Sequence, residues 1–475
     1  MRLISWTMWC ICLSSIWFSL GWASIALAAT YTCGASGANN SCSPTGMTNL
    51  IATASNGDTI IIASGTHAFN SGTPVVINKR ISILGGGSCS GCGTNSSSWS
   101  GSVQLNTGSV NAFRIDVNTV ASGIVRISGI HFSGAPGFTY HWWDGDGSSL
   151  PSGFFMVFSS NRAEYRIDNN WFDSTTAHNG GFLNTPGVVD HNIFESDQIE
   201  GHMLFVQDYR TDGDGSAAWA EPTVYGGGLN NRWVFIEANT FIRPIGGVIF
   251  ESSVVDTYAG GRYVFRYNYV RNGWILNHDK SGGGDTRSGV AFEVYNNTFN
   301  FESSVTFQGA MYLRDGSMLY YNNNHVGFWQ AFVKFWNRRM DEAQGNWGLC
   351  NGSQAWDSND GAGPAGHRCA DQVGTGKTNG LGRINTQPQQ ALPVRIWNNS
   401  GTASGGCAGT SQHNNKICNA NATSIIDGID YIFSDNATAA PVGYIAYSYP
   451  HPLTNGGGGG ADLVPPAAPA GVSVS

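Results

Sequence analysis

Charged residues are infrequent in this chain of 475 residues. Lys and Arg number 24 and Asp and Glu 32, which is 12% of the chain, against about a quarter in soluble globular proteins. The net charge of -8 argues against a nucleic-acid partner, which needs a basic face. Leu, Lys and Glu are also few, which argues against a long helical protein. Glycine is abundant, with 64 residues, and aromatics reach 12%. Disorder is excluded, because it requires low hydrophobicity and high net charge. A large, β-rich and turn-rich protein remains.

Residues 1–29 have the features of an export signal. Arg2 is followed by the apolar run Leu3–Leu20 and by small residues at Ala26–Ala28, the order that such signals show. The alternative is an N-terminal membrane anchor, since the run is near spanning length. No second long apolar run exists, so we expect a secreted or cell-surface protein with no further membrane segment. Residues 456–475, rich in Gly and Pro, are expected to form a tail.

Of the 10 cysteines, Cys10 and Cys12 lie in the signal. An even number in the rest of an exported chain favours disulfides. The simplest local pairing is 33–42, 89–92, 350–369 and 407–418. The 89–92 spacing is also compatible with zinc, although no second close pair of ligands accompanies it. We expect four disulfides, two of which staple loops at 341–372 and 401–420.

A recurring phrase runs through the middle of the chain. It consists of a few alternating apolar residues, an Asn, one further residue and an apolar or aromatic residue. It occurs at Tyr165–Phe172, Val188–Phe194, Trp233–Phe241, Tyr263–Val270, Phe292–Phe299 and Leu319–Val326. The last residues of successive phrases are 22, 47, 29, 29 and 27 positions apart. Periods of 20 to 50 residues are typical of stacked supersecondary units.

Each unit has short period-2 strands and Gly/Asn turns, with little room for a helix. The pattern therefore predicts an all-β fold, a right-handed parallel β-helix (β-solenoid) of about ten coils. Stacked Asn side chains would pair between coils. A β-sandwich array is the structural alternative, but it predicts hairpin signals that are not prominent. We expect one domain over residues 30–455, with coils from about 50 to 400 and an inserted loop at about 208–229.

The strands that precede the Asn phrases end in polar or ionisable residues. Aligned by that pattern, they form one column on a solenoid face, with neighbouring strands about 4.8 Å apart. Its members are Gln207, Glu251, His278, Arg314 and Lys334. In a chain so poor in charge, this concentration indicates a functional groove. The alternative is that these residues only solvate an exposed face.

Several phrases resemble the pectin/pectate lyase-like right-handed parallel β-helix superfamily. The first coils resemble it at Asn56–Thr66 and Ile81–Gly87, and later coils at Val188–Asn192, Phe250–Asp256, Tyr267–Val270, Asp285–Arg287 and Tyr295–Phe299. The resemblance covers about residues 50–400 and is sharper over 188–326. It implies a secreted lyase that cleaves an acidic, uronic-acid polysaccharide by β-elimination.

The resemblance also implies a calcium site. Glu251 and Asp256 stand where the family's calcium carboxylates would be, although their spacing is one residue longer. Asp208, from the adjacent coil, is a further candidate ligand. Ca²⁺ held by such oxygens would neutralise the substrate carboxylate as a Lewis acid.

Arg314 matches the second, substrate-binding Arg of the family's Arg-x-Pro-x-x-Arg phrase, but Gly309 stands at the position of the first, catalytic Arg. The proton-abstracting residue is therefore either absent or replaced by His278 or Lys280. Imidazole titrates near neutrality and is the easier base.

The substrate-binding set comprises the columnar Gln207 and Lys334, together with Arg287 and Trp274. Trp274 is a candidate for stacking on a sugar ring. Two other functions stay open, namely a non-catalytic glycan-binding or surface solenoid and a glycoside hydrolase on the same fold. In each case we expect a monomer.

Overall fold

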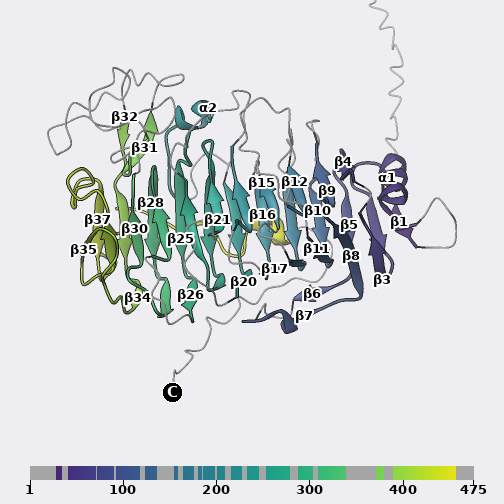
Figure 1. The fold of residues 1–475 in the computed structure, drawn as a ribbon. Coiled ribbons are helices and arrows are strands. Elements are labelled where there is room, and N and C mark those ends of the chain that lie inside the picture. Colours follow the sequence, from purple (N-terminus) through teal and green to yellow (C-terminus); the bar gives the residue numbers. More distant parts are fainter. Residues whose placement is uncertain are drawn as a thin grey trace, which may run out of the picture.

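Three long β-sheets run side by side along the molecule (Figure 1). The structure is a computed structural model that describes residues 28–34, 41–70, 72–89, 93–117, 123–135, 154–158, 164–175, 180–183, 186–197, 201–208, 215–226, 233–244, 253–278, 287–302, 309–337, 371–378 and 389–455. Within these residues the sheets have 12, 10 and 11 strands, and we call them sheets A, B and C in that order.

The strands of each sheet follow one another in chain order, except that β35 lies outside β36 in sheet C. Sheet A contains β1 (Thr30–Cys33), β2 (Thr59–Ile62), β5 (Ser82–Leu84), β10 (Val125–Ser128), β13 (Tyr165–Asp168), β16 (Gly187–Asp190), β19 (Val234–Glu237), β22 (Arg262–Arg266), β25 (Ala291–Tyr295), β28 (Ser317–Tyr321), β33 (Val394–Trp397) and β37 (Tyr431–Ser434). Sheet B contains β3 (Gly65–Ala68), β8 (Val103–Gly108), β11 (His131–Gly134), β14 (Trp171–Ser174), β17 (Ile193–Ser196), β20 (Thr240–Ile242), β23 (Tyr269–Arg271), β26 (Thr298–Phe301), β29 (Asn324–Gly327) and β34 (Ser400–Gly401). Sheet C contains β4 (Val75–Ile77), β9 (Phe113–Ile115), β12 (Met156–Phe158), β15 (Gly181–Leu183), β18 (Leu204–Val206), β21 (Ser253–Thr257), β24 (Trp274–Asn277), β27 (Met311–Leu313), β30 (Val333–Phe335), β36 (Ile417–Asn419) and β35 (Thr410–Gln412).

Two two-stranded sheets and a few short helices complete the described elements. The small sheets are β6 (Ser88–Cys89) with β7 (Trp99–Ser100), and β31 (Thr375–Thr378) with β32 (Gln389–Ala391). The helices are α1 (Pro44–Thr53), α2 (Ser216–Trp219), α3 (Pro452–Asn455) and the 3₁₀ turns η1 (Ser96–Ser98) and η4 (Ala437–Ala439). Helix α2 lies inside the insertion predicted at 208–229.

The chain passes from sheet A to sheet B, then to sheet C, and returns to the next strand of sheet A. Strands β16, β17, β18 and β19 show one such turn. Neighbouring strands of the three sheets pair in parallel, except that β35 pairs antiparallel with β36. This winding is a right-handed parallel β-helix, as the sequence predicted.

An asparagine ladder joins successive turns at the corner between sheets A and B. In each step the Oδ1 of one Asn accepts the backbone N–H and the Nδ2 of the Asn in the preceding turn, at 2.9–3.1 Å. Its members are Asn170, Asn192, Asn239, Asn268, Asn297, Asn323 and Asn399. The predicted stacking of Asn side chains is thus confirmed.

One phrase was misaligned by a single residue. Among three consecutive asparagines the ladder uses Asn323 and not Asn324, and sheet B pairs Phe299 with His325 and not with Val326. The three residues are chemically alike, so only the hydrogen bonds to Asn297 and Asn399 distinguish them.

Large apolar side chains fill the interior of the solenoid. Phe172, Phe194 and Phe241 stack with ring centroids 4.8 and 4.9 Å apart, which is the spacing of parallel strands. At the N-terminal end α1, capped by the Ser43 side chain, buries Met47 and Leu50 in the same core. This helix covers the open end of the coil (Figure 1).

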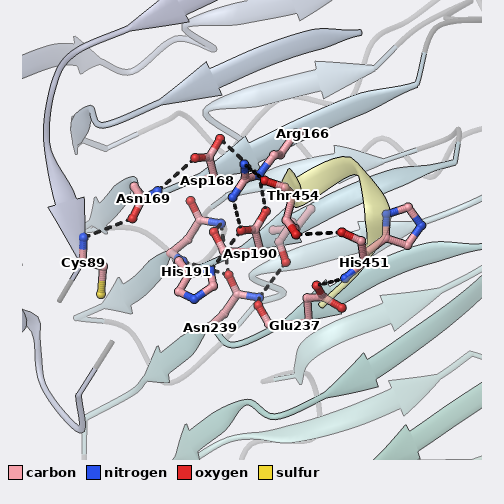
Figure 2. Close-up of polar contacts among 12 residues, drawn as sticks. Cys89, Arg166, Asp168, Asn169, Asp190, His191, Glu237, Asn239, His451 and Thr454 are labelled. Carbon is pink, nitrogen blue, oxygen red and sulfur yellow. Dashed lines mark hydrogen bonds and ion pairs between the residues drawn. The ribbon is translucent and has the colours of Figure 1, made fainter. Parts of the chain in front are cut away.

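A row of three acidic residues and one arginine crosses the outer face of sheet A. Asp168, Asp190, Glu237 and Arg266 follow one another in register across β13, β16, β19 and β22. Arg166 donates to Asp190 at 2.7 and 2.9 Å, and Arg266 lies 2.6 Å from Glu237. Figure 2 shows the first of these pairs beside Asp168 and Glu237.

Residues 436–455, which we call the C-terminal strap, lie over this charged face. The carbonyl of Thr454 accepts from Arg166 at 3.0 Å and the backbone N–H of His451 donates to Glu237 at 2.9 Å (Figure 2). The carbonyls of Tyr447 and Ser448 accept from Arg266. The strap therefore adds backbone hydrogen bonds to buried charges that already pair with one another.

Two of the four predicted disulfides are present, Cys33–Cys42 and Cys407–Cys418. Cys89 is disulfide-bonded, while Cys92, Cys350 and Cys369 lie outside the described residues. Disulfides favour an oxidising compartment. Within the described ranges, no helix has the length and apolar character needed to cross a membrane.

Candidate functional site

The outer face of sheet C carries the predicted column. Leu204, Val255, Ile275, Met311 and Val333 are aligned across neighbouring strands and point into the core. The residues that follow the strand ends are therefore also aligned and face outward. They are Gln207, Tyr258, His278, Arg314 and Trp336. Gln207, His278 and Arg314 thus lie in one row, as the alternation predicted.

Two details of that column were wrong. The strand of the intervening turn is β21 (Ser253–Thr257), not the expected 248–252, so Tyr258 takes the place assigned to Glu251. Both segments contain a short apolar run, and alternation alone does not choose between them. Lys334 is paired with Tyr312 and therefore belongs to the neighbouring outward row. Glu251 itself lies outside the described residues.

A buried Asp lies between two histidines on this face. Asp256 accepts a 2.8 Å hydrogen bond from His278 Nδ1 through Oδ2, and the same oxygen lies 3.6 Å from His202 Nε2. Its Oδ1 accepts from the backbone N–H of Thr257 at 2.7 Å. Burial raises the pKa of Asp256 to about 6, while His202 and Arg314 oppose that rise. Asp256 is therefore mostly ionised above neutral pH.

Two cations lie beside this group and share one aromatic ring. The Cζ of Arg314 is 5.1 Å from the Trp336 ring centroid, and the Nζ of Lys334 is 4.9 Å from it and 5.0 Å from Tyr312. Burial, with a smaller contribution from Arg314, lowers the pKa of Lys334 to about 8. The strand order places Arg314 next to His278. A positive, aromatic-lined patch therefore adjoins the Asp–His pair.

The other predicted substrate residues have different surroundings. The Oε1 of Gln207 is buried without a hydrogen-bond partner among the described residues. Trp274 is buried, with its ring 4.4 Å from that of Tyr312. Arg287 is also buried, forks onto Asp371 and lies 5.0 Å over Trp219. The structure thus places Arg287 in a buried ion pair with Asp371, while Lys280 lies outside the described residues.

Two of the three predicted calcium ligands, Asp256 and Asp208, lie within the described residues. Both oxygens of Asp256 already accept hydrogen bonds from the protein, and Asp208 lies 3.8 Å from Arg262. Within the described segments, no three acidic, His or Cys side chains are grouped so that they could hold a metal ion. Because Glu251 lies outside those segments, calcium binding stays a prediction.

Sequence reasoning missed His202, Tyr258 and Tyr312. The Tyr258 ring stacks on His278 at 4.3 Å, and His202 Nδ1 lies 2.7 Å from the Ser253 hydroxyl. His202 precedes its strand, outside the residues that the strand pattern aligns. Asp256, directly after Val254 and Val255 in β21, is the one local signal of the cluster.

No protein-family model matches the chain, and no curated protein matches it. The long parallel sheets are compatible with a β-helix fold, and neither comparison assigns the chain to a family.

Proposed function

We propose that this protein is an exported lyase that cleaves an acidic polysaccharide by β-elimination on the outer face of sheet C. The observation that supports it is the Asp256–His278 pair beside Arg314 and Lys334. A base next to two cations is what the reaction requires, because it removes a proton beside a carboxylate.

In the proposed elimination, Arg314, His278 and Lys334 each have one role. A substrate carboxylate pairs with Arg314, whose planar fork suits it. His278 accepts the proton from the carbon beside that carboxylate. The electron pair left behind forms a carbon–carbon double bond, and the bond to the glycosidic oxygen breaks. That oxygen takes a proton from a general acid, a role that we assign to Lys334 because its pKa is about 8.

Aromatic rings around the cations support a sugar ligand. Tyr258, Tyr312 and Trp336 line the row that holds His278 and Arg314. Aromatic rings combine apolar area with tolerance for adjoining polar groups. The site therefore offers both carboxylate and ring contacts to a uronic-acid polymer.

One observation favours a second candidate, a glycan-binding solenoid without catalysis. His278, Arg314 and Lys334 are 7%, 5% and 3% exposed. Side chains so deeply covered also suit a structural cluster, because burial strengthens their mutual electrostatic interactions.

A panel of uronic-acid polymers tests both candidates. A lyase produces unsaturated sugar ends that absorb in the ultraviolet. The absorbance is measured both with and without added Ca²⁺. We expect His278→Ala to lower turnover by roughly 10²–10⁴-fold, the usual contribution of a general base. We expect Arg314→Lys to lower kcat/KM by roughly 10- to 100-fold, because one charge-assisted hydrogen bond is lost.

Arg271→Lys, at the half-buried end of strand β23 in sheet B, is the matched control and should retain activity. Full activity of the His278 and Arg314 variants would move the chemistry to another face. Binding of acidic polymers without unsaturated products supports the glycan-binding candidate instead. Reducing ends without unsaturated ends would indicate a hydrolase.

A further inference from the structure

The hydrogen bonds of Asp256 determine which nitrogen of His278 carries a proton. An ionised carboxylate only accepts hydrogen bonds. The 2.8 Å contact between Asp256 Oδ2 and His278 Nδ1 therefore requires the proton to be on Nδ1. In a neutral imidazole the other nitrogen then has the lone pair. That nitrogen is Nε2.

We infer that Asp256 is a positioning residue: it holds the proton of His278 on Nδ1 and leaves Nε2 as the nitrogen that accepts a proton. The inference about catalysis rests on the proposed function, in which His278 is the base. The inference about the tautomer concerns the resting protein and stands independently of any reaction.

Further contacts hold both partners in place. The second oxygen of Asp256 accepts from Thr257 N–H at 2.7 Å, which prevents rotation of the carboxylate. The His278 backbone N–H donates to the Thr257 carbonyl, and the Tyr258 ring stacks on the imidazole with 27° between the planes. Three contacts thus fix the position and the ring plane of His278, namely those with Asp256, the Thr257 carbonyl and the Tyr258 ring.

His202 lies on the same carboxylate oxygen without competing for the hydrogen bond. Its Nε2 is 3.6 Å from Asp256 Oδ2, beyond hydrogen-bonding distance. Its Nδ1 is 2.7 Å from the Ser253 hydroxyl. His278 is therefore the imidazole whose tautomer Asp256 selects.

Exchange of Asp256 for Asn should reverse that selection. The Thr257 N–H can pair only with the amide oxygen of Asn, so the amide NH₂ would face His278 Nδ1. Two donors cannot pair, so the imidazole proton moves to Nε2 and Nδ1 becomes the acceptor. A base with its proton already on the reacting nitrogen is inactive, and the same exchange in a Ser-His-Asp triad lowers turnover about 10⁴-fold.

Nitrogen NMR of the full-length chain with ¹⁵N-histidine, at pH 8, tests the inference directly. His278 is assigned by the signal lost in His278→Gln. The expected wild-type result is a protonated Nδ1 and an unprotonated Nε2, and in Asp256→Asn the reverse. Asp173→Asn is the matched control, because Asp173 lies 3.4 Å from a different histidine, His131. It should leave the His278 signals unchanged.

A wild-type His278 protonated on Nε2 would overturn the inference, and this result requires no variant to fold. So would an Asp256→Asn protein with wild-type His278 signals. If the lyase assay succeeds, Asp256→Asn should lose turnover at unchanged KM, and added Ca²⁺ should not restore it. Restoration by Ca²⁺ would show instead that Asp256 holds the ion. Predicted tautomers without any cleavage would refute the proposed function and leave the positioning role of Asp256 intact.

Discussion

Removal of one amide from the middle of the asparagine ladder should destabilise the whole solenoid. The Oδ1 of Asn268 accepts the backbone N–H of Asn239 at 2.9 Å, and its Nδ2 donates to the carbonyl of Ile236 at 2.9 Å. All three residues are buried. Asn268→Ala therefore leaves one buried donor and one buried acceptor without partners and breaks the amide contacts to the turns on either side.

The magnitude follows from those two groups. An unsatisfied buried polar group costs about 1–3 kcal/mol, so we expect Asn268→Ala to lower the free energy of unfolding by about 2–6 kcal/mol. This is a large share of the ~5–15 kcal/mol that stabilises a typical protein. Asn399→Ala, at the end of the ladder and 8% exposed, should cost less because water can replace part of the lost contact.

Urea unfolding followed by fluorescence measures the effect as a shift in the midpoint at constant slope. Asn300→Ala is the matched control, because Asn300 is half-buried on sheet B and donates to the Tyr269 hydroxyl at 3.0 Å. Its expected cost is about 0.5–1.5 kcal/mol. If Asn268→Ala lowers the free energy of unfolding no more than Asn300→Ala does, the ladder hydrogen bonds do not stabilise the fold more than a surface hydrogen bond.

The repeat was visible in the sequence because the ladder needs one Asn at the same place in every turn. The left-handed conformation of the residue before the ladder Asn was not predictable where that residue is not itself an Asn. His191, Ala238 and Tyr267 all have φ between 54° and 58°, a left-handed conformation that Asn and Gly adopt more readily. The hydrogen bonds between turns impose this backbone whatever the residue, so turn composition alone does not locate these corners.

The functional row was only partly predictable for a related reason. A period-2 pattern predicts which residues of a strand share a face. It does not predict which of two apolar segments in one turn forms the strand. Residues 248–250 and 254–255 are both apolar, and strand β21 contains the second run. Asp256 follows that run and pairs with His278.

The strap lay beyond sequence reasoning altogether. Arg166 and Thr454 are 288 residues apart, and the contact uses a backbone carbonyl that any residue offers. The charged row on sheet A also interrupts the apolar pattern without forming a motif. Both become interpretable only when the strands are placed in register, because each Arg pairs with an acid from a neighbouring turn.

Two further predictions concern this strap. Arg266→Lys should lower the free energy of unfolding by about 1–3 kcal/mol, because Lys lacks the fork that reaches Glu237 and the carbonyls of Tyr447 and Ser448. Chymotrypsin should then cleave the strap faster than in the wild type. Equal cleavage rates would contradict this prediction. Glu293, which accepts from Tyr444 at 2.6 Å, has its pKa raised by burial from 4.5 to about 7. The pKa of this carboxyl is higher in the folded than in the unfolded protein. Its contribution to the free energy of unfolding is therefore complete below pH 4.5 and is lost as the pH rises through 7, a loss of about 3 kcal/mol. Urea midpoints should therefore fall between pH 5 and 8 in wild type and in the control Glu302→Gln but not in Glu293→Gln, and an unchanged slope in Glu293→Gln would refute the assignment.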